Sequence, residues 1–298
     1  MAHAPTQAHT DSSHYYIPGS SLWPIVASVS LISVMLGAAT YLNNWAGGAA
    51  FLPGALLLTL TFTGWFHSVI GENQAGTYNL QVDRSFRLGM LWFIFSEVMF
   101  FGAFFGALYY TRIFSTAWLG GHAAHIATNK YLWPGYTGAW PTNGPGHIGG
   151  HADGSFQTVP AFGLPLINTL ILLSSGVTVT IAHHALRAKH RGVLIAFLAA
   201  TFLLGFTFVF LQATEYHEAY TELGLRLSTG VYGSTFFMLT GFHGLHVTIG
   251  AIMLTVIWFR VLRGHFTPER HFAFEAVAWY WHFVDVVWLG LFVFVYWL

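Results

Sequence analysis

The chain has 298 residues, of which 55% are hydrophobic and only 7% are charged, against about 25% charged in ordinary soluble domains. Its formal net charge is zero, so it carries neither a basic surface for nucleic acid nor an acidic tail. The absence of cysteine excludes disulfides, thiolate-ligated haem, iron–sulfur clusters and cysteine-bridged copper centres, and the composition as a whole predicts an integral membrane protein.

Seven apolar segments are long enough to cross a bilayer, and in lipid such segments must be helical. The predicted spans are 22–42, 51–71, 86–111, 163–186, 193–214, 231–259 and 274–298. Residues 1–21 carry no Lys or Arg, so they are unlike the start of a signal peptide. We therefore expect a tail at 1–21, a two-helix transmembrane unit at 22–71 and a five-helix bundle at 72–298.

The distribution of basic residues in the loops predicts the orientation of the chain. Lys and Arg gather in alternate loops, at Arg84, Arg87, Arg187, Lys189, Arg191, Arg260, Arg263 and Arg270. The opposite loops carry only Arg112, Lys130 and Arg226. The positive-inside rule then places the N-terminus in the cytoplasm and the C-terminus outside. The long outer loop at 112–160 is rich in Gly, Pro and Trp, and its tryptophans favour a packed lid.

The third span contains one carboxylate, Glu97, whose neighbours three and four positions away are all apolar. It lies ten residues after Arg87, about 15 Å along a helix and half of a bilayer core of about 30 Å. An ionisable group at that depth is a candidate functional site. The alternative is a protonated carboxyl that only joins two helices by a hydrogen bond.

The last two spans carry polar groups at helical spacing. His243 and His246 are three residues apart in "GFHGLHVTIG", as are His282 and Asp285 in "WHFVDVVW", and Glu275 lies seven before His282. A di-iron bundle would need paired Glu-x-x-His motifs, which "EYHE" does not supply. A pair of these histidines could hold a haem, but we favour polar contacts between helices, with no metal on this chain.

Charged and aromatic residues at the cytoplasmic ends of two spans suggest contacts with lipid head groups. They are Trp65 and Glu72 after the second span, and Arg260, Arg263 and His265 after the sixth. Positive-inside topology with snorkelling side chains explains the arginines equally well. It explains Glu72 less well, because an acidic residue contributes little to orientation.

Long stretches of the chain resemble subunit III of the haem–copper oxidases, in particular that of cytochrome c oxidase. They are "RLGMLWFIFSEVMFFGAFF" (87–105), "GVYGSTFFMLTGFHGLHVTIG" (230–250) and "FEAVAWYWHFVDVVWL" (274–289), supported by "SLWPI" (21–25) and "LQATEY" (211–216). The resemblance covers almost the whole chain except the tail and the outer loop. Seven spans, where the related quinol oxidases usually have five, point to the cytochrome c branch.

The resemblance implies a non-redox subunit of an aa3-type oxidase, with haem a and copper in partner subunits I and II and cytochrome c as electron donor. It implies that the first two helices splay from the other five, leaving a V-shaped cleft filled with phospholipid. Glu97 matches the family's buried, carbodiimide-sensitive glutamate. The residues that match the lipid cleft are Trp65, Glu72, Arg260, Arg263 and His265. The expected role is to stabilise subunit I, hold phospholipids and support proton uptake and oxygen access.

The sequence departs from the family's mitochondrial pattern in two places. Segment 73–82 is shorter by one residue and lacks histidines, which puts part of one head-group site in doubt. The outer loop is longer, which favours a bacterial inner membrane over a mitochondrial one. Two other classes stay open: a transporter with Glu97, Glu275, His282 and Asp285 along a polar route, for which we find no internal repeat, and a haem-bearing membrane cytochrome.

Overall fold

The computed structural model describes residue 17 and residues 19–122 and 125–298. Within these ranges all regular structure is helical, and seven stretches are long and apolar enough to cross a membrane. The prediction of an all-α membrane protein with seven spans is confirmed. Most of the predicted tail at 1–21 lies outside the described residues.

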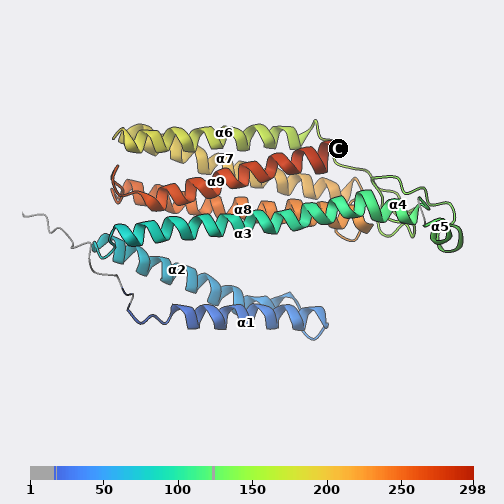
Figure 1. The fold of residues 1–298 in the computed structure, drawn as a ribbon, viewed down its shortest axis with the longest axis horizontal. Coiled ribbons are helices and arrows are strands. Elements are labelled where there is room, and N and C mark those ends of the chain that lie inside the picture. Colours follow the sequence, from blue (N-terminus) through green and yellow to red (C-terminus); the bar gives the residue numbers. More distant parts are fainter. Residues whose placement is uncertain (1–16, 18, 123–124) are drawn as a thin grey trace, which may run out of the picture. The chain divides into compact units, whose positions relative to one another are not determined.

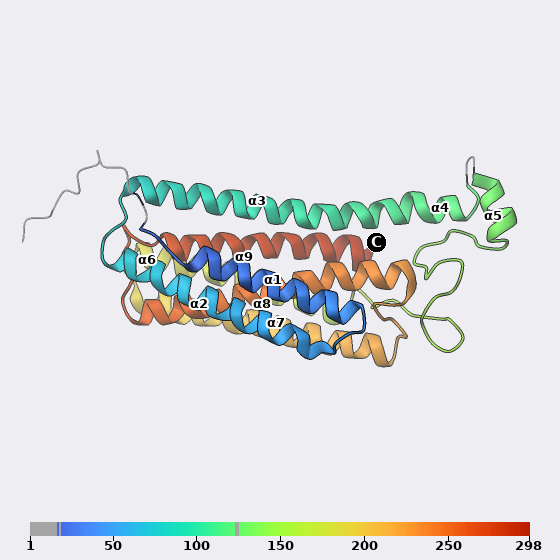
Figure 2. The same cartoon turned by 90° about the horizontal axis from the view of Figure 1, so that it is seen from below.

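Helices follow one another along the chain with short connections, apart from one long outer loop (Figures 1 and 2). The first two spans are α1 (Trp23–Leu42) and α2 (Leu52–Gln74), the latter preceded by a 3-10 turn (Gly48–Phe51). The third contains α3 (Leu80–Tyr110), a π-helical turn (Thr111–Ser115) and α4 (Thr116–Leu119), and α5 (Ile126–Leu132) lies in the outer loop. The remaining spans are α6 (Leu164–Arg187), α7 (Arg191–Thr221), α8 (Gly230–Leu262) and α9 (Phe272–Leu291), which ends in a π-helical turn (Phe292–Trp297).

Two helices extend well beyond their predicted ends. The third span was expected to stop at 111, but residues 112–119 of the predicted outer loop are helical. That stretch contains no Gly or Pro before Gly120, and the chain turns only at Gly121, where φ is +82°. Similarly, α7 continues past residue 214 to Thr221. The predicted ends fall where a charged residue, Arg112 or Glu215, interrupts the apolar run, but a single charged residue does not end a helix.

Contacts divide the chain into two compact units, one ending at Leu88 and the other beginning at Gly89. In the first unit, α1 and α2 form an antiparallel pair held by small residues. A Cβ atom at Gly54 would lie only 2.6 Å from the backbone nitrogen of Val34, and Ser30 Oγ lies 3.0 Å from Thr61 Oγ1. Small residues and interhelical hydroxyl contacts are the usual means of helix packing in lipid. The predicted boundary between residues 71 and 72 stays a prediction.

In the second unit, α9 packs against α6 and α8, and α7 packs against α6 and α8 (Figures 1 and 2). The central side chain is Trp281 of α9, which is fully buried. A Cβ atom at Gly205 of α7 would lie 2.6 Å from its ring, and one at Gly250 of α8 would lie 2.8 Å from it. The Trp281 Nε1–H also donates a 2.8 Å hydrogen bond to Ser175 Oγ of α6. One tryptophan therefore joins α9 to three helices.

The described part of the outer loop is folded onto the second unit. Asn129 Nδ2 donates to the carbonyl oxygens of Leu119 and Tyr136, which closes the chain around α5. The ring of Trp140 contacts that of Tyr232 at the start of α8, with 5.5 Å between centroids. Aromatic side chains thus anchor the loop to the bundle.

Candidate functional site

Glu97 of α3 contacts His246 of α8. Glu97 Oε2 and His246 Nε2 are 3.0 Å apart, and only 21% and 12% of the two side chains are exposed. The sequence singled out both residues but did not pair them. The two residues are 149 positions apart in the sequence, and their contact joins α3 to α8 within the second unit.

The second ring nitrogen of His246 constrains where the protons lie. Its Nδ1 is 2.6 Å from the carbonyl oxygen of Phe242, so Nδ1–H donates to that oxygen. A neutral ring then offers a lone pair at Nε2, to which a protonated Glu97 donates. A charged ring instead donates from Nε2–H to the Glu97 carboxylate. In both cases one proton lies between the side chains and the pair has no net charge, which lowers the cost of placing an acid in lipid.

Aromatic rings surround this pair. The centroid of the His246 ring lies 5.0 Å from that of Phe101 and 6.0 Å from that of Phe100. Tyr280 of α9 stacks on the same ring at 6.3 Å, and its hydroxyl donates to the His246 carbonyl oxygen at 3.3 Å. The arrangement allows a proton to move between Glu97 and His246. It provides a two-residue contact between helices.

Two more predicted histidines connect α9 to its neighbours. His243 of α8 is buried, and its Nε2 lies 3.2 Å from the carbonyl oxygen of Val284. His282 Nε2 lies 3.3 Å from Thr180 Oγ1 of α6, while its Nδ1 lies 3.6 Å from Asp285 Oδ2 on its own helix. Each imidazole in these spans therefore has its own set of protein partners.

Glu275 lies in the first turn of α9, next to two histidines that the sequence analysis did not select. Its Oε1 is 3.2 Å from His271 Nε2 and 3.8 Å from His183 Nε2 of α6. The two histidine nitrogens are 3.3 Å apart. The spacing of His271 and Glu275, four residues apart, could have suggested part of this cluster, but His183 is 92 residues away from Glu275 along the chain.

Arg260, Arg263 and His265 lie together at the end of α8. Arg260 is 8% exposed, and its guanidinium lies 4.5 Å from the centre of the Phe266 ring. Among the described residues, no hydrogen-bond acceptor contacts its Nε. Partial burial, followed by the positive charges of Arg260 and Arg263, lowers the pKa of His265. This end of the helix is therefore positively charged and offers a buried donor.

Trp65 and Glu72 lie on α2 in the first unit. The Trp65 side chain is 41% exposed, in a helix that also exposes Phe62 and Phe66. Glu72 Oε2 accepts a 2.7 Å hydrogen bond from the hydroxyl of Tyr78. The C-terminal part of α2 therefore has exposed aromatic side chains, followed by a polar last turn that contains Glu72.

Sequence reasoning missed one buried acid network near the C-terminal end of α7. The carboxylate of Glu215 on α7 is 1% exposed. It accepts a 2.7 Å hydrogen bond from the hydroxyl of Tyr296 and a 3.0 Å bond from Gln212 Nε2. The spacing of Gln212 and Glu215 on one helix face could have suggested part of it, but Tyr296 comes from the far end of the chain.

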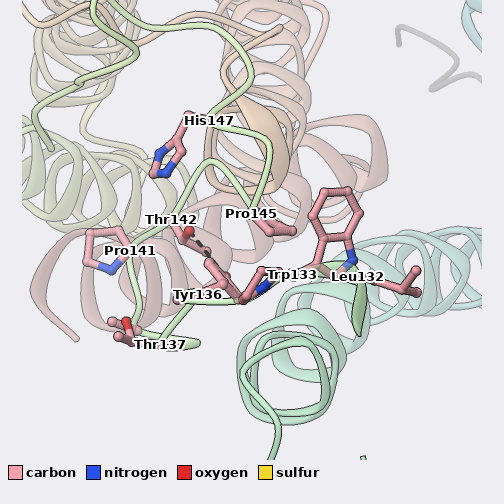
Figure 3. A pocket seen from close by; sticks show the side chains of 11 residues that line it. Leu132, Trp133, Tyr136, Thr137, Pro141, Thr142, Pro145 and His147 are labelled. Atoms are coloured by element: carbon pink, nitrogen blue, oxygen red, sulfur yellow. Dashed lines mark hydrogen bonds between the residues drawn. The ribbon is translucent and has the colours of Figure 1, made fainter. Parts of the chain in front are cut away.

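A hollow of about 400 Å³ lies in the outer loop (Figure 3). Trp133, Pro141 and His147 are among the side chains that line it, and the Tyr136 hydroxyl donates a 3.2 Å hydrogen bond to Thr142 Oγ1. None of the described residues that line it is acidic, so they offer no pair of carboxyl groups for acid–base chemistry.

Comparison with known proteins identifies strong relatives. A family model described as cytochrome c oxidase subunit III matches residues 13–131 and 149–298. Proteins named cytochrome c oxidase subunit 3 from Oncorhynchus clarkii and Pongo abelii are 41% and 42% identical to the chain, each over 298 residues, which is 100% of the chain and 99% of the relative. The protein of that name from Gadus morhua is 41% identical over 292 residues, covering 98% of both chains.

Proposed function

Because the chain belongs to the cytochrome c oxidase subunit III family, we propose that it braces the oxygen-reducing subunit of the complex and holds phospholipids at the inner face of the membrane. Membership makes it an accessory subunit of a terminal respiratory oxidase. The observation that carries the proposal is that polar side chains within the predicted spans contact other helices of the same chain. Glu97, His243, His246 and His282 each contact another helix of the same chain.

Electron transfer then takes place in partner subunits, with haem a and copper in subunit I and the copper that receives electrons from cytochrome c in subunit II. Two features of this chain support that division. It has no cysteine for a cysteine-bridged copper centre. His246, His243 and His282 contact a carboxyl, a carbonyl and a hydroxyl, respectively, as expected of residues that join helices.

The end of α8 is the first lipid site that we propose. Phosphate is an acceptor that suits a guanidinium well, and Arg260 is 8% exposed at this end of α8. Arg263 and His265 add positive charge or hydrogen-bond donors beside it. Basic pockets on the inner side of a membrane typically bind lipid head groups.

In the first unit we propose that Trp65 and Glu72 line a second lipid contact. Trp at a membrane interface anchors a helix among head groups, and exposed apolar rings on the same helix suit acyl chains. The V-shaped lipid cleft implied by the resemblance stays a prediction. Oxygen is apolar and partitions into hydrocarbon, so ordered lipid is a plausible path for its access to the oxidase.

The chain is a multi-pass membrane protein of a respiratory complex. The three relatives named above come from two fish and a mammal, so the bacterial origin expected from the long outer loop is not supported. For the orientation, we propose that the basic loops, including Arg187 to Arg191 and Arg260 to Arg270, lie on the inner face. This places the N-terminus inside and the C-terminus outside.

Extraction in a mild detergent tests the proposal. A tagged form of this chain should co-purify with a haem-bearing partner whose visible spectrum is that of an oxidase. Separated from that partner in a stronger detergent, the chain should be colourless. Haem that stays with the separated chain, or purification without any haem-bearing partner, would contradict the proposed role.

A further inference from the structure

The cluster of His183, His271 and Glu275 lies between the end of α6 and the start of α9. Its three ligand atoms are His183 Nε2, His271 Nε2 and Glu275 Oε1, and they all lie within 4.8 Å of one another. The side chains are 28%, 9% and 16% exposed, so the cluster is accessible but not fully solvated. From this geometry we propose that the cluster is a binding site for a divalent zinc ion.

The spacing of the ligand atoms suits a tetrahedral ion. Zinc binds nitrogen and carboxylate oxygen at about 2.0–2.2 Å, which places neighbouring ligand atoms of a tetrahedron roughly 3.3–3.6 Å apart. The three separations here are 3.2, 3.3 and 3.8 Å. The ligands can therefore surround zinc with little movement, and a water molecule can complete the coordination, as it does in other sites with two histidines and one glutamate.

Surrounding residues orient the ligands for this purpose. His271 Nδ1 lies 3.2 Å from the carbonyl oxygen of Thr267, so an Nδ1–H donated there leaves the lone pair of Nε2 facing the other two ligands. This is the usual arrangement of a metal-binding histidine and its supporting hydrogen bond. The His183 ring packs against buried Phe274, with 5.5 Å between centroids. Both histidines are thus held in place by contacts outside the cluster.

Without a metal, the close contacts among His183, His271 and Glu275 require a hydrogen-bond donor between each pair of facing atoms. His271 Nε2 faces a second imidazole nitrogen and a carboxylate oxygen, and one neutral imidazole cannot donate from both of its nitrogens. A proton on His271 is therefore the competitor of the metal. Zinc has no redox chemistry, so this site would stabilise the junction of α6 and α9 and add no electron-transfer centre.

Metal analysis of the intact oxidase complex tests the proposal. After chelation and dialysis against dilute zinc sulfate, the wild-type complex should bind one zinc ion more than complexes with His183→Ala, His271→Ala or Glu275→Gln. The matched control is His184→Ala, because His184 is the exposed neighbour of His183 and lies outside the cluster. It should bind as much zinc as the wild type. Equal zinc in the wild type and the three cluster variants would overturn the proposal.

A ligand exchange gives a test that does not depend on losing the site. A His183→Cys variant keeps a ligand at that position, so it should retain zinc, and X-ray absorption should show a new zinc–sulfur distance of about 2.3 Å. Zinc bound without any sulfur neighbour would place the ion elsewhere and overturn the assignment. Haem spectra and the presence of this chain in each complex confirm that the variants have assembled.

Discussion

Replacing Gly250 with valine is expected to lower the free energy of unfolding of the chain by about 1–3 kcal/mol, the usual cost of overpacking a well-packed core. A Cβ atom at this position would lie 2.8 and 2.9 Å from the ring of Trp281 and 3.2 Å from that of Tyr280. The Trp281 ring has little room to move away. Gly205 of α7 packs against another part of the ring, and the Trp281 Nε1–H donates a hydrogen bond to Ser175 Oγ. Unfolding of the purified chain in mixed micelles by added SDS measures the change.

Gly244 offers a matched control on the same helix. A Cβ atom there would meet nothing within 4 Å inside the chain, so Gly244→Val should change the unfolding free energy by less than about 0.5 kcal/mol. If Gly250→Val and Gly244→Val lower the unfolding free energy equally, the effect of valine comes from its helix propensity. In that case the contact between α8 and α9 at Trp281 would not be the reason for glycine at position 250.

The contact between Glu97 and His246 should stabilise the bundle by about 0.6–1.7 kcal/mol, which runs from the average to the largest value measured for hydrogen bonds between membrane helices. A double-mutant cycle with Glu97→Leu and His246→Leu measures this coupling, because each change removes one partner. Glu97→Gln should lose less than Glu97→Leu, since the amide N–H₂ can donate to His246 Nε2 when the ring is neutral.

The cycle also separates the two interpretations of Glu97. A coupling energy in the expected range, with normal proton pumping by an oxidase that contains Glu97→Gln, is the result for a carboxyl that joins helices. Normal stability with slowed proton uptake would instead assign Glu97 a role in proton movement. A coupling energy of zero would contradict the contact itself.

The sequence was sufficient for the number of spans, because apolar length in lipid has few alternative interpretations. It also singled out Glu97 as an acid with no polar neighbour on its own helix, and left open whether it is a functional group or a contact between helices. It could not choose His246 over His243 or His282, since all three occupy similar apolar spans and their separation along the chain carries no information about which helices adjoin. Helix packing settles that choice, through residues such as Trp281 that touch three helices at once.

Other features depended on contacts that no local pattern contains. The helical stretches 112–119 and 215–221 were missed because Arg112 and Glu215 interrupt the apolar runs by which the spans were recognised. The cluster that we propose binds zinc was missed because the histidines weighed as ligands from the sequence lie in the last two spans, whereas His183 lies near the end of α6 and His271 precedes α9. Its third ligand, Glu275, was selected only as a polar contact between helices.

The most direct test of the proposed supporting role is oxygen consumption by the oxidase with and without this chain during continuous turnover. The complex that lacks the chain should keep its haem spectrum and begin reducing oxygen, and then lose activity within fewer turnovers than the intact complex. Haem that stays bound to the removed chain, or complete loss of oxygen reduction from the first turnover while the rest of the complex keeps its haem, would contradict a purely supporting role.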